Sequence, residues 1–293
     1  MARVSVVIPL FNKARFIEAS IASVLSQSMG DFELIVVDDG SEDGGDRIAE
    51  RTGDVRVRVL RYPNGGVSAA RNRGVAIARS ALVAFLDADD LWDPRFLEFV
   101  VGALEGHPEA VAAFCAFGEG KGGHSRLPAL ANELLIPDYP GWFIRYAGRG
   151  LWCSNSLVRK NALEACGLFP WGVQIGEDTD TWFRLSFEGP IVFVPKMLCS
   201  YVIDDEASLS KSRQAEEPIV IRSIGSALEA GKVPNAAKAS ALAAIDYFRV
   251  AYASALAMEG RRHEALVQVR NSKLRLRLWR TYLRAVIAFV FGR

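Results

Sequence analysis

Two stretches decide the fold: Val4-Ser-Val-Val-Ile8 and Phe32-Glu-Leu-Ile-Val-Val37. Each is apolar and largely β-branched, too short for a helix and continuous enough for a strand covered on both faces. Between them, apolar side chains recur at helical spacing through residues 13–28. Strand, helix and strand in this order predict a βαβ unit, which places the two strands parallel and side by side.

The alternation continues along the next part of the chain. We expect helices over residues 45–52 and 67–79, and strands over residues 55–60 and 82–86. Such a pattern predicts an α/β fold with a doubly wound, mostly parallel sheet. In these sheets ligands bind beyond the carboxyl ends of the strands, so the loops that follow the strands are the candidate site.

Later segments carry a different pattern. Residues 106–150 are rich in Gly and Pro, and we expect irregular structure or long loops there. From about residue 216 onward the chain is rich in alanine, and a helical hairpin is expected over residues 239–258 and 262–271. This divides the chain into a ligand-binding domain, residues 1–210, and a helical C-terminal extension, residues 211–293.

Composition narrows the class of protein. The chain has 293 residues, of which 50% are hydrophobic and 24% charged, so it can bury a substantial core. The net charge of +1 excludes a nucleic-acid binder that depends on bulk basicity. The charge is uneven, because residues 211–293 hold 15 basic and 6 acidic side chains, or +9, which leaves −8 for residues 1–210.

The cysteines and the N-terminal residues indicate the cellular compartment that we expect for the protein. The four cysteines are widely spaced and form no zinc-binding pattern, so we expect buried thiols in a reducing compartment. Residues 1–4 enter a strand directly and do not resemble a signal peptide, and no continuous apolar stretch reaches the roughly 18 residues that span a bilayer. The expectation is a cytoplasmic protein, with the inner face of the membrane as a candidate point of contact.

Carboxylates gather where the predicted strands end. Asp87 and Asp89, followed by Asp90, come directly after an apolar strand, and Asp38 and Asp39 end another. Oxygen ligands of this kind suit Mg²⁺ or Mn²⁺, which keep positions open for water and a diphosphate. Placing several carboxylates at one sheet edge is costly unless a cation or a ligand rich in donors offsets the repulsion. The cluster therefore predicts a binding site.

The chain resembles the inverting family 2 glycosyltransferases of the GT-A fold. The resemblance covers roughly residues 3–210 and rests on five motifs in family order. They are Val4-Ser-Val-Val-Ile-Pro-Leu-Phe-Asn12, Leu34-Ile-Val-Val-Asp-Asp-Gly-Ser41, Gly65-Gly-Val-Ser-Ala-Ala-Arg-Asn-Arg-Gly74, Ala84-Phe-Leu-Asp-Ala-Asp-Asp-Leu-Trp92 and Gly176-Glu-Asp-Thr-Asp-Thr-Trp-Phe-Arg184. The resemblance implies transfer of a sugar from a nucleotide-sugar, in such enzymes often UDP-linked, to a hydroxyl of a glycan or lipid-linked acceptor.

The resemblance also implies residue roles on the donor side. The positions that match its nucleotide-binding residues are Pro9, Asn12, Asp38, Asp39, Arg71 and Asp87. Among them, Asp39 would accept the base N3–H that uracil offers, and Arg71 would be the basic partner near the nucleotide. Asp87 and Asp89 match the D-x-D motif, which implies a Mn²⁺ or Mg²⁺ cofactor that bridges the two phosphates of the donor.

On the acceptor side, the resemblance implies that Asp178 is the general base. A carboxylate in a partly dehydrated pocket has a raised pKa, which favours proton acceptance near neutrality. Sequence alone leaves two alternatives open: Asp180 as the base, or Glu177 and Asp178 as capping residues of the following helix. Further candidate contacts to the acceptor or donor sugar are Glu177, Trp152, Asn155 and Asp204, the last standing where many relatives carry a histidine.

The C-terminal tail has the pattern of an amphipathic helix. Residues 273–291 combine arginines with apolar side chains at helical spacing, which is typical of a helix in a membrane interface or of one packed on its own domain.

A non-catalytic nucleotide-sugar-binding protein is one alternative function. A sugar-1-phosphate nucleotidyltransferase is another, although it would need a glycine-rich loop where Pro9-Leu-Phe-Asn12 stands.

Overall fold

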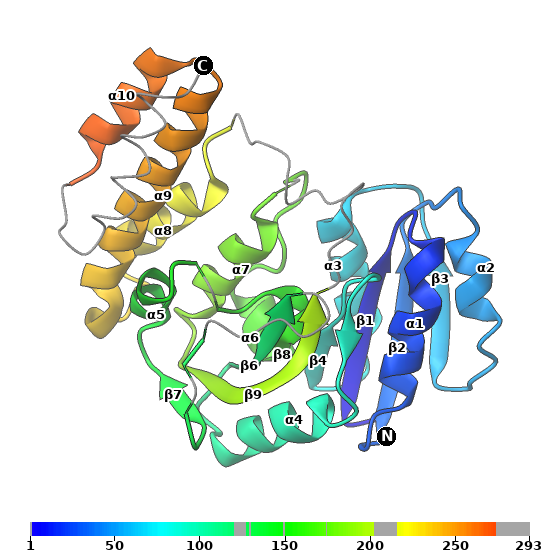
Figure 1. The fold of residues 1–293 in the computed structure, drawn as a ribbon. Helices are drawn as coiled ribbons and strands as arrows, with labels where there is room; N and C mark the ends of the chain where they lie inside the picture. Colours follow the sequence, from blue (N-terminus) through cyan, green and yellow to red (C-terminus); the bar gives the residue numbers. More distant parts are fainter. Residues whose placement is uncertain are drawn as a thin grey trace.

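The protein is an α/β sheet structure with a helical C-terminal region (Figure 1). The computed structural model describes residues 2–119, 127–128, 130–148, 150–173, 175–201 and 216–273. Two of the expectations lie outside these ranges. They are the role of Asp204 and, apart from its first residue, the tail over residues 273–291.

Nine strands form one sheet within the described part of the chain. Their bounds are β1 (Val4–Leu10), β2 (Phe32–Asp38), β3 (Val57–Arg61), β4 (Leu82–Phe85), β5 (Leu91–Trp92), β6 (Ala112–Glu119), β7 (Leu134–Ile136), β8 (Ser156–Arg159) and β9 (Ile191–Tyr201). The helices are α1 (Ala14–Leu25), α2 (Gly45–Glu50), α3 (Val67–Ile77), α4 (Phe96–Gly106), α5 (Tyr139–Arg145), α6 (Lys160–Ala165), α7 (Glu177–Leu185), α8 (Ile219–Glu229), α9 (Lys238–Met258) and α10 (Arg262–Asn271), with 3-10 turns η1 (Cys153–Asn155) and η3 (Asn235–Ala237).

The strand order, β3-β2-β1-β4-β8-β6-β9-β5, places the site. β3, β2, β1 and β4 are parallel, and β6 is parallel to β9, whereas β8, β5 and β7 run antiparallel to their neighbours. The chain moves outward from β1 to β3 and then returns past β1 to β4. Right-handed crossovers therefore place α1 and α3 on opposite faces, and the reversal leaves a crevice at the carboxyl ends of β1 and β4.

Most of the expected elements are confirmed, with small shifts at their ends. The strand expected over residues 55–60 begins at Val57, because Val55 is 97% exposed and lies in the preceding turn. The helical hairpin is confirmed as α9 and α10. The four cysteines form no disulfide; three are buried and Cys166 is partly buried, and burial raises the pKa of Cys115 to about 12.

The expectation of irregular structure over residues 106–150 is wrong in part. β6 lies at the centre of the sheet between β8 and β9, and β7 and α5 follow in the same stretch. The β6 sequence Ala112-Ala-Phe-Cys-Ala-Phe117 is low in β-branched residues, so strand propensity does not reveal it. Its small side chains fit the buried centre of the sheet, where packing outweighs propensity.

The C-terminal helices pack on the sheet domain instead of standing apart. α8 contacts α7 and α9 contacts α5, so Val220, Ile224 and Ala244 join the main hydrophobic core. Figure 1 shows α8, α9 and α10 gathered at one end of the molecule. In the described residues, one helix, Asn235–Met258, is long and apolar enough to cross a membrane, and 44% of its apolar window is buried against the rest of the protein.

Gly74 sets how closely α3 lies on β1. A methyl group at Gly74 would overlap Val7 Cγ1, which is itself fully buried. We expect Gly74→Ala to lower the free energy of unfolding by about 1–3 kcal/mol, measured by chemical denaturation. The exposed helical Gly102 is the matched control, since a methyl group there meets nothing and should stabilise α4 by up to about 1 kcal/mol. A Gly74→Ala cost that persists unchanged in a Val7→Ala background would contradict this packing.

Candidate functional site

The first loop of the site joins the ends of β1 and β2. Asn12 has a left-handed backbone with φ 51°, which asparagine tolerates better than most residues. Its N–H donates to Ser41 Oγ at 3.1 Å, and its side-chain oxygen accepts from the N–H of Glu42 at 2.9 Å. Pro9 is buried inside β1, beyond the point at which β4 pairing ends. Both predicted nucleotide contacts therefore shape the rim of the site.

Asp38 and Asp39 are buried and already hydrogen-bonded. Asp38 Oδ1 accepts from the N–H of Ser41 at 3.1 Å and closes the turn after β2. Asp39 accepts from the N–H groups of Gly65 and Gly66 at 2.7–3.1 Å and from Arg73 Nη1 at 2.9 Å. Asp39 thus fixes the glycine loop that opens α3. The predicted contact with a base N3–H stays a prediction.

Arg71 lies beneath the site and joins two of its carboxylates. Its Nη2 donates to Asp87 Oδ1 and its Nη1 to Glu177 Oε1, both at 2.8 Å. The Arg71 side chain is 5% exposed, and its guanidinium packs over the ring of Phe169 at 5.3 Å. In this structure Arg71 does not reach the open surface, because both terminal nitrogens are paired. Its predicted contact with the nucleotide stays a prediction.

Asp87 and Asp89 remain partly open. Their side chains are 33% and 23% exposed, and each uses one oxygen: Asp87 Oδ1 with Arg71, and Asp89 Oδ2 with Lys13 Nζ at 2.7 Å. A tight turn, in which the N–H of Asp90 donates to the Asp87 carbonyl at 3.0 Å, holds them together. The described residues contain no group of three or more acidic, His or Cys side chains that would cage a metal. Two carboxylates that leave room for phosphate and water still fit Mg²⁺ or Mn²⁺.

Asp178 stands at the start of α7, where its proton affinity is raised. Loss of solvent around the side chain, together with the neighbouring charge of Glu177, raises the pKa of Asp178 to about 6. The first residue of α7 follows Gly176, whose φ of 79° favours glycine and which serves as the N-cap. Asp178 is therefore not the N-cap, and among the described residues its Oδ1 accepts from the N–H and hydroxyl of Thr179 at 2.6 and 3.3 Å.

Asp180 does not present a usable carboxylate. Its side chain is 1% exposed, and its Oδ2 accepts from Arg184 Nε at 2.8 Å, one helical turn away. The same arginine donates to the carbonyl groups of Cys166 and Leu168, so the pair fastens α7 to the segment after α6. A buried carboxylate that is paired in this way cannot reach an acceptor hydroxyl. Of the two candidate bases, the structure favours Asp178.

The predicted acceptor contacts near residue 152 divide into two groups. Trp152 is partly exposed and lies against Phe117, with ring centroids 4.0 Å apart. Asn155 is fully buried, and its amide donates to the carbonyl groups of Cys115 and Gly150 at 2.9 and 3.1 Å. The structure does not support the expected acceptor contact of Asn155, because the side chain is sealed in the core. Glu177 is likewise buried against Arg71.

Two residues whose roles the sequence does not indicate, Ser154 and Lys13, also contribute to the site. Ser154 is fully buried, and its Oγ accepts from the N–H of Asp87 at 3.0 Å while its carbonyl accepts from Trp92 Nε1. Lys13 forms the ion pair with Asp89. Neither belongs to an acidic or glycine-rich pattern. The position of Lys13 directly after the Pro9–Asn12 loop is the one signal that could have indicated it.

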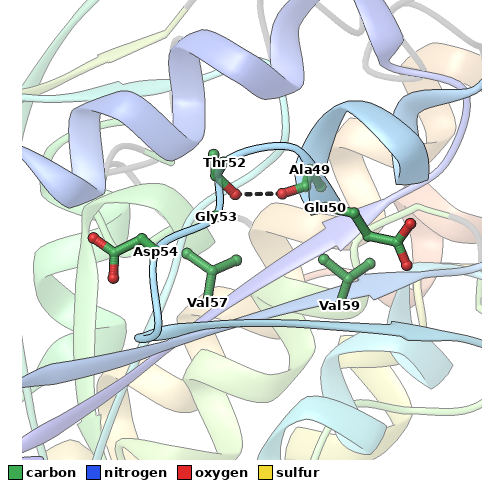
Figure 2. Close-up of a pocket in the computed structure, with 7 residues that line it drawn as sticks. All are labelled: Ala49, Glu50, Thr52, Gly53, Asp54, Val57 and Val59. Carbon is green, nitrogen blue, oxygen red and sulfur yellow. Dashed lines mark hydrogen bonds between the residues drawn. The ribbon is translucent and has the colours of Figure 1, made fainter.

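A pocket lies elsewhere, at the outer edge of the sheet between α2 and β3 (Figure 2). Its lining residues are Ala49, Glu50, Thr52, Gly53, Asp54, Val57 and Val59. Hydrogen bonds from Arg56 lower the pKa of Asp54 to about 2, and Glu50 pairs with Arg61 at 2.9 Å. The Thr52 hydroxyl donates to the Ala49 carbonyl, as Figure 2 shows. Since these polar groups are paired, we assign the pocket no chemistry.

The unequal environments of Asp178 and Asp180 give opposite expectations for stability. A raised pKa means that ionised Asp178 destabilises the fold, so Asp178→Asn should raise the free energy of unfolding at pH 8 by on the order of 1–3 kcal/mol. This gain should shrink as the pH falls through 6 towards 4, where the wild-type carboxyl is protonated. Asp180→Asn should lower stability by roughly 1–3 kcal/mol, because Arg184 loses its charged partner. Denaturation at both pH values measures this, and equal effects of the two variants would contradict it.

Comparisons with known proteins identify the family of the chain. The family model described as glycosyl transferase family 2 matches residues 5–167. A poly(ribitol-phosphate) β-N-acetylglucosaminyltransferase of Staphylococcus aureus, TarP, is 41% identical over 103 residues, which cover 33% of this chain and 32% of that protein. The minor teichoic acid biosynthesis protein GgaA of Bacillus subtilis is 36% identical over 189 residues, covering 59% of this chain and 41% of that protein. The matches therefore span well under two thirds of these relatives.

Solved structures share the fold at low identity. The 1–349 fragment of TarS from S. aureus, in complex with UDP-GlcNAc, superposes with a TM-score of 0.68 at 18% identity, over 100% of this chain and 81% of that one. The mannosyltransferase PcManGT of Pyrobaculum calidifontis, in complex with GDP-Man and Mn²⁺, gives a TM-score of 0.65 at 18% identity, over 99% of this chain and 88% of that one. These likenesses confirm the GT-A fold. The chain belongs to glycosyl transferase family 2.

Proposed function

We propose that this glycosyltransferase transfers a sugar from a UDP-linked donor to a hydroxyl of a glycan or lipid-linked acceptor, with inversion at the anomeric carbon. One observation carries the proposal: Arg71 joins Asp87, beside the candidate metal ligand Asp89, to the start of the helix that presents Asp178. An open carboxylate pair for a metal and a carboxylate with a raised pKa thus lie in one cluster. A single displacement needs these two functions together.

On the donor side, Asp87 and Asp89 would hold Mn²⁺ or Mg²⁺ through the oxygens that their ion pairs leave open. A bound divalent cation supplies positive charge to a departing diphosphate. The protein's own contribution is to keep the two carboxylates close and oriented. Ser154 and Arg71 do this for Asp87, and the tight turn to Asp90 does it for the segment between them.

On the acceptor side, Asp178 would accept the proton of the attacking hydroxyl. The acceptor oxygen forms a bond to the anomeric carbon as the bond from that carbon to the diphosphate oxygen breaks, and the bonding electrons leave with the nucleoside diphosphate. A pKa of about 6 leaves Asp178 mostly ionised near neutrality while retaining basicity, which suits a general base.

The choice of donor and acceptor rests on relatives and not on contacts in this chain. UDP-GlcNAc in the TarS complex supports a UDP-sugar, whereas GDP-Man in PcManGT shows that the fold also accommodates another base. The names of TarP and GgaA support an acceptor among cell-envelope polymers. We further propose action in the cytoplasm at the membrane face, supported by the excess of basic residues after residue 210.

Nucleotide binding should depend on the metal. We expect UDP to bind in Mn²⁺ roughly tenfold or more tightly than in chelator, and Asp89→Ala to remove that difference, because the phosphates then lose their bridge to the protein. Calorimetry measures both affinities. Asp54→Ala removes one carboxylate far from the site and should behave as the unchanged protein. Equal affinities with and without Mn²⁺ in the unchanged protein would reject the metal role.

Transfer should require Asp178 in its ionised form. We expect Asp178→Asn to lower turnover by roughly 100-fold or more, the usual scale of general acid–base catalysis, while UDP affinity changes little. In the unchanged protein, kcat/KM should fall as the pH drops below about 6, because the base is then protonated. The measurement is release of UDP in the presence of acceptor across pH 4.5–8, a range chosen to bracket that pKa.

The stability of the Asp178→Asn variant serves as the control for this assay. Because Asp178→Asn should be folded and at least as stable as the unchanged protein, a loss of turnover cannot be assigned to unfolding. A variant that keeps its turnover, or a pH profile without an acid limb near 6, would place the base elsewhere.

A further inference from the structure

The ammonium group of Lys13 forms an ion pair with Asp89, one of the two candidate metal ligands. Lys13 Nζ lies 2.7 Å from Asp89 Oδ2, and the two side chains are 21% and 23% exposed. Lys13 comes from the loop after β1, and Asp89 comes from the loop after β4. The pair therefore spans the crevice at which the sheet reverses direction, the place where the donor phosphates are proposed to bind.

The surrounding contacts hold Lys13 in place. Asp43 Oδ2 accepts from the N–H of Ala14 at 2.7 Å, which fixes the backbone directly after Lys13. Further along α1, Ser20 Oγ donates to the carbonyl of Ala88 at 2.8 Å, which fixes the segment directly before Asp89. The start of α1 and the carboxylate turn are thus joined at two points. These contacts hold the backbone next to Lys13 and the backbone next to Asp89 close together, within reach of the ion pair.

An ammonium and a divalent cation compete for the same carboxylate. A metal bound at about 2.1 Å from Asp89 Oδ2 would meet the Lys13 charge at close range, so the ion pair must open before that oxygen can ligate. The diphosphate of a donor brings new negative charge that can receive the displaced ammonium, whereas metal alone brings none. Lys13 therefore penalises metal that arrives without nucleotide.

We propose that Lys13 is a positioning residue that acts as the internal counter-ion of Asp89 and competes with the divalent cation in the nucleotide-free enzyme. The proposal rests on the proposed metal role of Asp89. As a consequence, the binding of metal and the binding of nucleotide are energetically coupled. The metal displaces the Lys13 ammonium from Asp89, and the diphosphate of the nucleotide receives it.

The test is Mn²⁺ affinity without nucleotide, read from the paramagnetic resonance signal of unbound Mn²⁺. Lys13→Gln keeps a polar side chain without charge and should bind Mn²⁺ about two- to fivefold more tightly, the range expected for a partly exposed ion pair. Lys13→Arg keeps the charge and should resemble the unchanged protein. Addition of saturating UDP should tighten Mn²⁺ binding less in Lys13→Gln than in the unchanged protein.

Arg15→Gln is the matched control for net charge. Arg15 lies over the same Phe16 ring as Lys13, each at 5.5 Å from its centroid, and it has no carboxylate partner in the described part of the chain. If Arg15→Gln tightens Mn²⁺ binding as much as Lys13→Gln does, or if Lys13→Gln does not tighten it, the counter-ion role is wrong.

Asp89→Asn separates this result from failure of the metal role itself. Loss of Mn²⁺ binding in Asp89→Asn, with no effect of Lys13→Gln, would overturn the counter-ion role and leave the proposed function intact. Unchanged Mn²⁺ binding in Asp89→Asn would overturn both. Tightened binding in Lys13→Gln together with loss in Asp89→Asn is the expected pair of results.

Discussion

One buried guanidinium, that of Arg71, holds the two halves of the site together. A charge with 5% exposure is costly to bury, and it is tolerated here because two carboxylates, Asp87 and Glu177, bind it at 2.8 Å. These partners lie 16 and 106 residues away in the chain. Arg71 therefore ties the turn after β4 to the first residue of α7, and it fixes both relative to α3.

The position of α3 in turn depends on how closely it packs. Gly74, one helical turn after Arg71, lets α3 lie directly on Val7 of β1. Asp39 holds the other end of the helix through the N–H groups of Gly65 and Gly66. A shift of α3 away from the sheet would carry the guanidinium with it. The geometry of the candidate site thus rests on backbone packing in the core as well as on charge.

Charge compensation also separates the carboxylates by role. Asp39 accepts from backbone donors and pairs with Arg73, Asp87 pairs with Arg71, and Asp89 pairs with Lys13. Loss of solvent and the neighbouring charge of Glu177 raise the pKa of Asp178 in the same cluster to about 6, and Asp178 forms no ion pair within the described residues. Carboxylates of one residue type thus occupy different environments, as an acid–base step and a metal site require.

The sequence predicts the location of the candidate site better than it predicts the hydrogen-bond and ion-pair partners of the site residues. Apolar runs followed by Asp38 and Asp87 predict strand ends, and the structure brings those ends together, because parallel pairing follows from the βαβ pattern. The burial of Asn155, the hydrogen bonds of Asp39 to the glycine loop and the Lys13–Asp89 pair could not be predicted, since each depends on contacts between segments distant in sequence. β6 was missed because packing, and not propensity, makes that alanine-rich stretch a strand.

We propose a single displacement in which Asp178 takes the proton while Asp87 and Asp89 serve the leaving group. The most direct measurement is the anomeric configuration of the first product formed from an α-linked UDP-sugar, read by proton NMR from the coupling at the anomeric position. A single displacement gives a β-linked product in every turnover. An α-linked product would require two displacements or a front-side path, and it would contradict the role assigned to Asp178.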